Sequence, residues 1–328
     1  MSKAEKLKQG EYRSRLAARI ECQGTACEHS IASENQPALL RCTLKAINFA
    51  WLEVRMKRLA FWLVVSAPSF AGLASAQQLQ SRWMDELNWM EFREIVPAKV
   101  KTVLLTTGTL EPHGVVNNGA DNLAPVKIAE AIAPEVNALI APHIPYGVTG
   151  SMAPYPGAIH IPAEVYAPYV RAVLVGLVRD GFKNIVIING HGGPQTEALD
   201  RVSQEVALEY RVNTLVVDWW GACADAAQEV FGNAGGHAGE NETAFIQAIN
   251  PKLVKKERYS DALATANPPP HAWSATPFPS SIGLYKKGEG TPRDFDQKKA
   301  EDYFQRVTSC VGGLVKDTLR KWTLAGFN

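Results

Sequence analysis

Short apolar runs alternate with helical patterns from residue 77 to the end of the 328-residue sequence. The run Asn-Ile-Val-Ile-Ile-Asn at 184–189 is apolar at every inner position and rich in β-branched residues. Such a run is typical of a strand that is buried on both faces of a parallel sheet. Similar patterns predict strands at 101–106, 138–144, 184–189 and 214–218, and helices at 123–135, 163–180, 196–210, 240–249 and 297–321.

This order of elements predicts an α/β fold. Strands that alternate with helices imply right-handed βαβ units and a three-layer α/β domain. We therefore expect a three-layer α/β/α sandwich with a mostly parallel central sheet, formed by a single domain of residues 77–328. Residues 255–295 are rich in proline and lack a clear period. We expect them to form a long surface excursion, a kind of segment that is often functional or interface-forming.

Residues 56–76 have the three parts of a secretory signal. Lys57 and Arg58 form the basic start, an apolar stretch follows at 59–73, and Ala-Ser-Ala at 74–76 fits the cleavage site. A membrane anchor and a buried helix are the alternatives, but the apolar stretch is shorter than the roughly 20 residues that span a bilayer. The pattern favours a cleaved signal peptide, and hence a periplasmic or secreted protein without membrane attachment after cleavage.

Residues 1–55 stand in front of this signal, although a signal belongs at the N-terminus of a chain. The simplest interpretation is that translation begins at Met56 and that residues 1–55 are an upstream extension assigned through a start-site error. A genuine N-terminal extension is the alternative. Neither segment is included in the predicted domain.

Several functional classes are disfavoured by composition and motifs. A net charge of +1 gives no reason to expect a nucleic-acid partner. The sequence has no G-x-S-x-G motif of serine hydrolases and none of the glycine-rich motifs that bind dinucleotides or nucleoside triphosphates. Beyond residue 77 only Cys223 and Cys310 occur, without metal-site spacing. They fit a disulfide or two buried thiols equally well.

Three loops at predicted strand ends carry histidine and carboxylate residues. Glu111 and His113 follow the first strand, and His191 lies in the turn Asn-Gly-His-Gly-Gly-Pro after the strand at 184–189. A third loop, Gly-Gly-His-Ala-Gly-Glu-Asn-Glu-Thr at 235–243, contains His237 and opens a helix. In parallel α/β sheets ligands bind beyond the carboxyl ends of the strands. We therefore expect the three loops to meet at one rim.

The residue types in these loops predict a catalytic metal site. Imidazole nitrogen and carboxylate oxygen are ligands for Zn²⁺, Mn²⁺ or Fe²⁺, and the lack of cysteine disfavours a structural zinc site. A shared carboxylate, Asp121, would hold two cations about 3.5–4 Å apart with a hydroxide between them. One alternative is a phosphate-binding turn at Gly190–Gly193. Another is that Glu240 and Glu242 only complement the dipole of their helix.

In this order, the motifs Glu-x-His-Gly followed by Asp, Asn-Gly-His-Gly-Gly, and His-Ala-Gly-x-x-Glu-Thr resemble those of the creatininase (creatinine amidohydrolase) family over residues 104–250. The resemblance implies a metal-dependent amide hydrolase with a three-layer α/β fold, assembled as a homo-oligomer, commonly a hexamer. The family also includes a formamide deformylase of flavin and deazaflavin synthesis and a peptidase of mycofactocin maturation.

The resemblance also implies roles for particular residues. It makes two divalent cations the cofactors, with five metal ligands: Glu111, His113, Asp121 as the bridge, His191 and Glu242. It makes His237 the group that passes a proton to the leaving nitrogen. Trp220, in the pair Trp219-Trp220, resembles an aromatic residue of the substrate pocket, although ordinary packing explains these tryptophans equally well.

The sequence departs from the family pattern near the predicted substrate. Asp121 follows Glu111 by ten residues instead of eleven, with Val-Val-Asn-Asn-Gly-Ala in place of the usual His-Leu-Pro segment. Gly193 and Gly236 stand where creatininase has glutamates, and Met152 stands where a histidine is usual. The motifs are thus closer to those of the deformylase and peptidase branches. We predict hydrolysis of a non-peptide, linear or cyclic amide C–N bond in a small molecule. The alternatives are a metallopeptidase of a small peptide and a binding protein that retains its metal.

Overall fold

The computed structural model describes residues 79–266, 272–284 and 294–327. The predicted signal peptide at 56–76 and the upstream extension at 1–55 lie outside the described residues. Within the described ranges, no helix combines the length and the apolar character that a membrane span requires.

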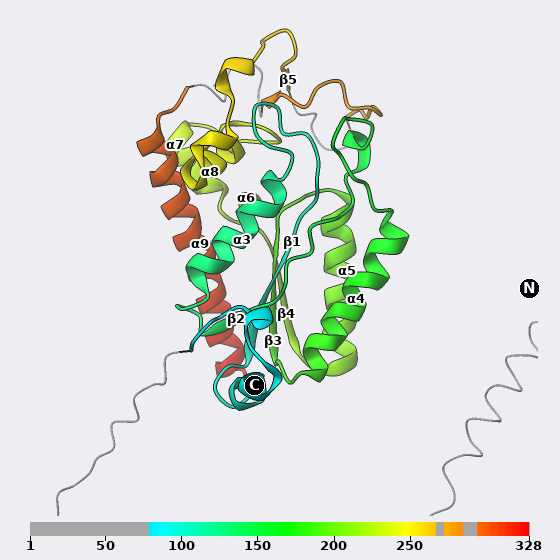
Figure 1. The fold of residues 1–328 in the computed structure, drawn as a ribbon, viewed down its shortest axis with the longest axis vertical. Coiled ribbons are helices and arrows are strands. Elements are labelled where there is room, and N and C mark those ends of the chain that lie inside the picture. Colours follow the sequence, from blue (N-terminus) through cyan, green and yellow to red (C-terminus); the bar gives the residue numbers. More distant parts are fainter. Residues whose placement is uncertain (1–78, 267–271, 285–293, 328) are drawn as a thin grey trace, which may run out of the picture. The chain divides into compact units, whose positions relative to one another are not determined.

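The centre of the fold is a four-stranded sheet in which all strands are parallel. Its order is β2 (Ala138–Ile140), β1 (Thr102–Thr107), β3 (Asn184–Asn189) and β4 (Asn213–Asp218). The last three strands pair along their full length, so that Thr107, Asn189 and Asp218 end level with one another. The loops that leave these strands therefore start side by side at one edge of the sheet (Figure 1).

Helices cover both faces of the sheet. One layer contains α3 (Ala120–Ile132), α8 (Glu240–Ile249) and α9 (Gln297–Leu324), and the other contains α4 (Ala163–Arg179) and α5 (Pro194–Tyr210). Successive strand residues point to opposite faces. Leu104 packs in the cluster of the first layer, and Val103 and Leu105 pack in the cluster of the second. The predicted three-layer α/β/α sandwich with a parallel sheet is confirmed.

Some element boundaries differ from those predicted. Strand β2 ends at Ile140 and not at residue 144, because its pairing with β1 becomes irregular there. The Ala141 N–H donates to the Leu104 carbonyl, but the next bond to β1 comes three residues later, from the Ile144 N–H to the Thr106 carbonyl. Three helices were not predicted: α2 (Trp89–Ile95), α6 (Trp219–Ala222) and α7 (Ala224–Phe231). Helix α2 begins with a capping box in which the Asn88 side chain accepts from two backbone N–H groups and Glu91 bonds back to the Asn88 N–H.

The remaining elements are short. They comprise the two-stranded parallel sheet of β5 (Thr265–Ala266) and β6 (Gly283–Leu284), and four 3-10 turns: η1 (Met84–Glu86), η2 (Gly150–Met152), η3 (Pro251–Leu253) and η4 (Lys256–Arg258). The described part of the proline-rich excursion packs on the body of the protein. The Phe278 N–H donates to the Ser151 carbonyl at 3.0 Å, and the Tyr155 hydroxyl donates to the Phe278 carbonyl at 2.8 Å.

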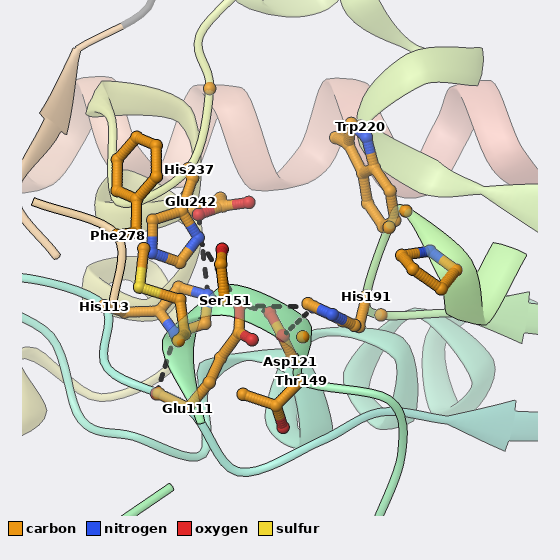
Figure 2. A pocket seen from close by; sticks show the side chains of 17 residues that line it. Glu111, His113, Asp121, Thr149, Ser151, His191, Trp220, His237, Glu242 and Phe278 are labelled. Atoms are coloured by element: carbon orange, nitrogen blue, oxygen red, sulfur yellow. Dashed lines mark hydrogen bonds and ion pairs between the residues drawn. The ribbon is translucent and has the colours of Figure 1, made fainter. Parts of the chain in front are cut away.

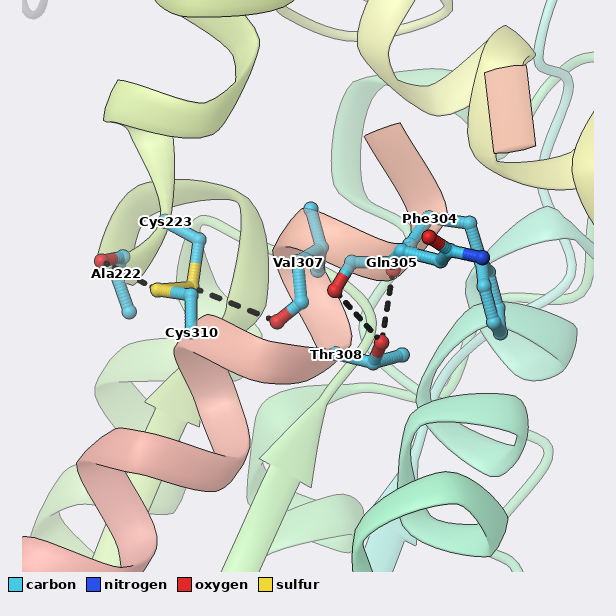
Figure 3. The surroundings of a disulfide bond; sticks show 7 residues. All are labelled: Ala222, Cys223, Phe304, Gln305, Val307, Thr308 and Cys310. Atoms are coloured by element: carbon cyan, nitrogen blue, oxygen red, sulfur yellow. Dashed lines mark hydrogen bonds between the residues drawn. A yellow bond between two sulfur atoms is a disulfide. The ribbon is translucent and has the colours of Figure 1, made fainter. Parts of the chain in front are cut away.

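Cys223 and Cys310 form a disulfide, which decides between the two alternatives that the sequence left open. It joins the end of α6 to the middle of α9, across a separation of 87 residues (Figure 3). The position matters for the site, because α6 begins with Trp219 and Trp220 directly after β4.

Candidate active site

The three predicted loops converge on one cavity of about 480 Å³ beyond the carboxyl ends of the strands (Figure 2). All seven predicted site residues line this cavity: Glu111, His113, Asp121, His191, Trp220, His237 and Glu242. The shared rim that the strand-end argument predicted is therefore present, and the imidazoles and carboxylates face one another.

The first loop supplies three of these groups. Glu111 and His113 follow β1 and are each only 1% exposed, while Asp121 lies in the first turn of α3. The Nδ1 atom of His113 lies 3.1 Å from the Glu111 carbonyl, so its Nε2 atom faces Asp121 Oδ1 at 2.9 Å. Gly108 permits this return of the chain, because a Cβ there would lie 2.3 Å from the Asp121 carbonyl oxygen. The interval of ten residues thus still brings Asp121 into the cluster.

The second loop supplies His191 with the opposite ring orientation. Its Nδ1 atom lies 3.0 Å from Asp121 Oδ2 and 3.2 Å from Glu111 Oε1. Its Nε2 atom lies 3.0 Å from the carbonyl oxygen of Val148, to which it can only donate. The two oxygens of Asp121 therefore face two histidines that come from different loops.

The third loop distinguishes between its two glutamates. The Glu242 carboxylate accepts from the Ala238 N–H at 2.7 Å and lies 3.6 Å from His113 Nε2. The Glu240 carboxylate instead accepts from the Asn233 amide at 2.7 Å and does not line the cavity. Of the two, only Glu242 is placed to bind a ligand of this cavity.

His237 lies against the same cluster. Its Nε2 atom donates to the Pro112 carbonyl at 2.9 Å, and its Nδ1 atom faces Glu111 Oε1 at 3.5 Å. Its ring centroid lies 4.6 Å from that of His113. Since one nitrogen is occupied by the backbone, Nδ1 is the atom of His237 that can exchange a proton in the cavity.

The close packing of these groups shifts their protonation strongly. Burial disfavours the charged form of His113, but the carboxylates of Asp121, Glu242 and Glu111 outweigh it and raise the pKa of His113 to about 10. The same balance, with Glu111 and Asp121 as partners, raises the pKa of His191 well above its usual value. Without a cation, imidazolium charges thus hold the carboxylates together.

The pKa values of Glu242 and His237 shift in the direction that burial favours. Burial raises the pKa of Glu242 to about 7. Burial, helped by the charge of His113, lowers the pKa of His237 to about 4, so that its imidazole is neutral at neutral pH.

The donor set fits divalent cations. Two groups have ligand atoms within 4.8 Å of one another: Glu111, His113 and His237, and Glu111, Asp121 and His191. The Oε2 atom of Glu111 is buried and has no hydrogen-bond partner within the described part of the chain. Such an orphaned acceptor requires an explanation, and a cation would satisfy it. A cation would also replace the imidazolium protons between the carboxylates.

The two neighbouring tryptophans have different surroundings. Trp219 is buried and packs on Phe245 with ring centroids 4.8 Å apart, whereas Trp220 lines the cavity. The packing interpretation therefore holds for Trp219, while Trp220 both packs against the core and lines the cavity. Sequence reasoning missed other lining residues, among them Thr149, Ser151 and Phe278. Their only sequence signals were the Pro-Tyr-Gly turn upstream of the first two and the proline-rich excursion around Phe278.

Comparison with known proteins identifies the family to which this chain is similar. The creatininase family model, described as creatinine amidohydrolase, matches residues 85–315. The creatinine amidohydrolase of Pseudomonas putida is 26% identical over 231 residues, which are 63% of this chain and 88% of that protein. The mycofactocin precursor peptide peptidase of Mycobacterium ulcerans (strain Agy99) is 29% identical over 180 residues, 50% of this chain and 65% of that protein. A solved structure named "Creatininase Mn" has the same fold, with a TM-score of 0.62 at 21% identity, over 73% of this chain and 98% of that one.

Proposed function

This chain belongs to the creatininase family, and we propose that it is a divalent-metal-dependent amidohydrolase that cleaves a non-peptide, linear or cyclic amide C–N bond in a small molecule. The observation that carries the proposal is the convergence of three carboxylates and three imidazoles on one cavity at the carboxyl ends of the strands. A cluster of this kind has no structural role that would offset the cost of burying its charges.

We assign the metal ligands from their contacts. Asp121 presents Oδ1 to His113 and Oδ2 to His191, so that its carboxylate would be shared between the two cations. Glu242 would complete the side of His113, and Glu111 the side of His191. Nitrogen and oxygen ligands suit Zn²⁺ and Mn²⁺, with Fe²⁺ as a further candidate. The similarity to the solved structure named "Creatininase Mn" supports manganese as one choice.

The chemistry divides between the cations and the protein. When bound, the two cations would lower the pKa of a shared water to give the nucleophile and would polarise the substrate carbonyl. His237 is neutral near pH 7 and keeps Nδ1 directed into the cavity, because its Nε2–H donates to the Pro112 carbonyl. It can therefore take up the proton of the nucleophile at Nδ1 and release it to the departing nitrogen.

The apolar part of the wall would hold the substrate. Trp220, Phe278 and Met152 line the cavity together with the hydroxyl-bearing Thr149 and Ser151. Flat aromatic surfaces with a few polar groups suit a small molecule that carries an amide. We propose that Trp220 packs on the substrate beside the reacting bond.

One alternative within the enzymes is a metallopeptidase that acts on a small peptide. The 29% identity to the mycofactocin precursor peptide peptidase favours it. The other alternative is a binding protein that keeps the metals without turnover. Its support is the changed segment Val115–Ala120 between the first two carboxylates of the site.

We also propose a periplasmic or secreted location and a homo-oligomer, with a hexamer as the expected form. The signal-like segment at 56–76 and the disulfide Cys223–Cys310 support the location, because disulfides persist in oxidising compartments. Exposed Val165 and Tyr169 on α4 offer apolar surface for contacts between subunits. No nucleic-acid partner is proposed.

Turnover screening tests the proposed function. The purified protein, loaded with Zn²⁺ or Mn²⁺, would be assayed with lactams, creatinine, N-formyl compounds and short peptides. We expect hydrolysis in one of the non-peptide classes, and the His191→Ala variant should lose that activity together with bound metal. Activity against peptides alone would favour the peptidase. Retained turnover by a metal-free His191→Ala protein would contradict the proposal.

A further inference from the structure

A buried amide outside the predicted motif residues contacts both segments that hold His191. Gln195, the second residue of α5, is fully buried. Its Oε1 atom accepts from the Val148 N–H at 3.0 Å, and its Nε2 atom donates to Asn189 Oδ1 at 2.9 Å. Val148 belongs to the segment after β2, and Asn189 is the last residue of β3.

Both partners of Gln195 hold His191 directly. The Val148 carbonyl accepts from the ring Nε2 of His191 at 3.0 Å. Asn189 donates to the His191 carbonyl at 2.5 Å, and its Oδ1 atom accepts from the His191 N–H at 3.3 Å. Gln195 therefore links the residue that orients the imidazole to the residue that fixes its backbone.

The link has a chemical consequence for metal binding. Because Nε2 of His191 donates to the Val148 carbonyl, the neutral imidazole keeps its hydrogen on Nε2, which leaves a lone pair on Nδ1, the nitrogen that faces Asp121 and Glu111. A histidine binds a metal through its unprotonated nitrogen, and the hydrogen bond of the other nitrogen decides which one that is. A shift of Val148 would weaken the preference of His191 for carrying its hydrogen on Nε2.

The surrounding chain is shaped to admit the amide. A Cβ at Gly147 would lie 1.8 Å from Gln195 Oε1 and 2.7 Å from the Gly108 carbonyl, so only glycine fits. Asn189 has additional partners in Thr107 and Asp218, at 3.1 and 2.7 Å. Loss of the Gln195 amide should therefore affect the Val148 side more than the Asn189 side.

We propose that Gln195 is a positioning residue that fixes the ring orientation and tautomer of His191 for metal binding. The proposal rests on the proposed metal-dependent function of the same site. Loss of a residue that orients a metal-binding histidine typically lowers metal affinity by about 10- to 100-fold. We expect a loss of that size for one of the two cations when the amide of Gln195 is removed.

The test is a titration of the metal-free full chain with Co²⁺, followed through its visible absorption, which reports the ligand set. Gln195→Leu removes both hydrogen bonds, and Gln247→Leu is the matched control, because Gln247 is a buried glutamine on α8 without a contact to His191. We expect Gln195→Leu to weaken one Co²⁺ affinity and change the spectrum, and Gln247→Leu to retain both. Unchanged affinities and spectrum in Gln195→Leu, or an equal loss in Gln247→Leu, would overturn the role.

Two further measurements apply if Gln195→Leu does not fold. Gln195→Glu keeps an oxygen for the Val148 N–H but has no hydrogen for Asn189, and we expect it to retain more of the Co²⁺ affinity than Gln195→Ala. Nitrogen-15 NMR of the Zn²⁺-loaded unmodified protein should show His191 with its hydrogen on Nε2, and a metal-bound Nε2 would overturn the role. If the unmodified protein binds no Co²⁺ at all, the proposed function fails as well.

Discussion

His113 and His191 face the same carboxylate from two loops that are built differently. The ring of His113 is held by the Glu111 carbonyl, two residues away in its own loop. The ring of His191 is held by the Val148 carbonyl, 43 residues away, and that segment is fixed in turn by Gln195. Local sequence is enough to orient the first histidine, whereas the second depends on tertiary structure. The two sides of the site should therefore respond differently to mutation.

The largest loss of metal binding and turnover is expected for a change at Asp121, which lies between His113 and His191. Asp121→Ala removes a carboxylate that contacts both histidines, so both cations should be lost and turnover should fall to background. Metal analysis of the dialysed variant and a turnover assay check this. Glu240→Ala is the matched control, since Glu240 contacts Asn233 outside the cavity and should leave both cations bound. A variant without Asp121 that still holds two cations would contradict the shared role.

A second change separates chemistry from metal binding. His237→Gln should lower kcat by about 10²- to 10⁴-fold, the range typical for the loss of a general acid–base group. The loops of His113 and His191 are not altered, so both cations should remain bound. Parallel measurements of kcat and of metal content would decide the point. Loss of one cation in this variant would instead make His237 a ligand, as its 3.5 Å contact with Glu111 permits.

The disulfide should affect stability without touching either histidine. Replacing Cys223 and Cys310 together with serine releases a loop of 87 residues and should lower the free energy of unfolding by about 4 kcal/mol. Chemical denaturation of the oxidised protein and the variant measures this. The variant should keep its affinity for both cations, but KM should rise, because α6 carries Trp220. Equal stability of the two proteins would show that the crosslink does not stabilise the fold.

The smallest expected effect is on the pH dependence of the stability, and it comes from His143. The half-buried His143 lies 2.8 Å from the Thr106 hydroxyl and 2.9 Å from Asn122 Oδ1, and burial lowers its pKa to about 4. Between about pH 6.5 and pH 4 the unfolded chain binds this proton and the folded chain does not. Stability from this group is thus present above that window and is lost as the pH falls through it, by at most about 3 kcal/mol.

The variant His143→Asn checks this pH dependence. Its free energy of unfolding should change less between pH 6.5 and pH 4 than that of the unmodified protein, because the group that titrates differently in the two states is gone. Denaturation curves at several pH values give the comparison. Identical pH dependence of the two proteins would contradict the assignment.

The frame of the site could be predicted from the sequence because it depends on local patterns. Strands with apolar inner positions, such as Asn184–Asn189, identify a parallel sheet, and the sheet alone brings Glu111, His191 and their neighbours to one rim. Helix α8 was predicted with its observed bounds, Glu240–Ile249, since its acidic first turn marks the start.

What the sequence did not reveal depends on contacts between distant segments. The resemblance named Glu242, but the physical reason for Glu242 over Glu240 lies in which way the third loop turns, and the role of Gln195 rests on the approach of Val148. The pairing of Cys223 with Cys310 likewise requires the positions of α6 and α9. No local pattern encodes such contacts.

Asp121 is proposed to join two cations in one site. The most direct measurement is electron paramagnetic resonance of the metal-free protein titrated with Mn²⁺, combined with metal analysis of the same samples. We expect two Mn²⁺ per chain and a signal of magnetically coupled ions, because a shared carboxylate holds them close together. A single Mn²⁺ per chain, or two ions without coupling, would contradict it.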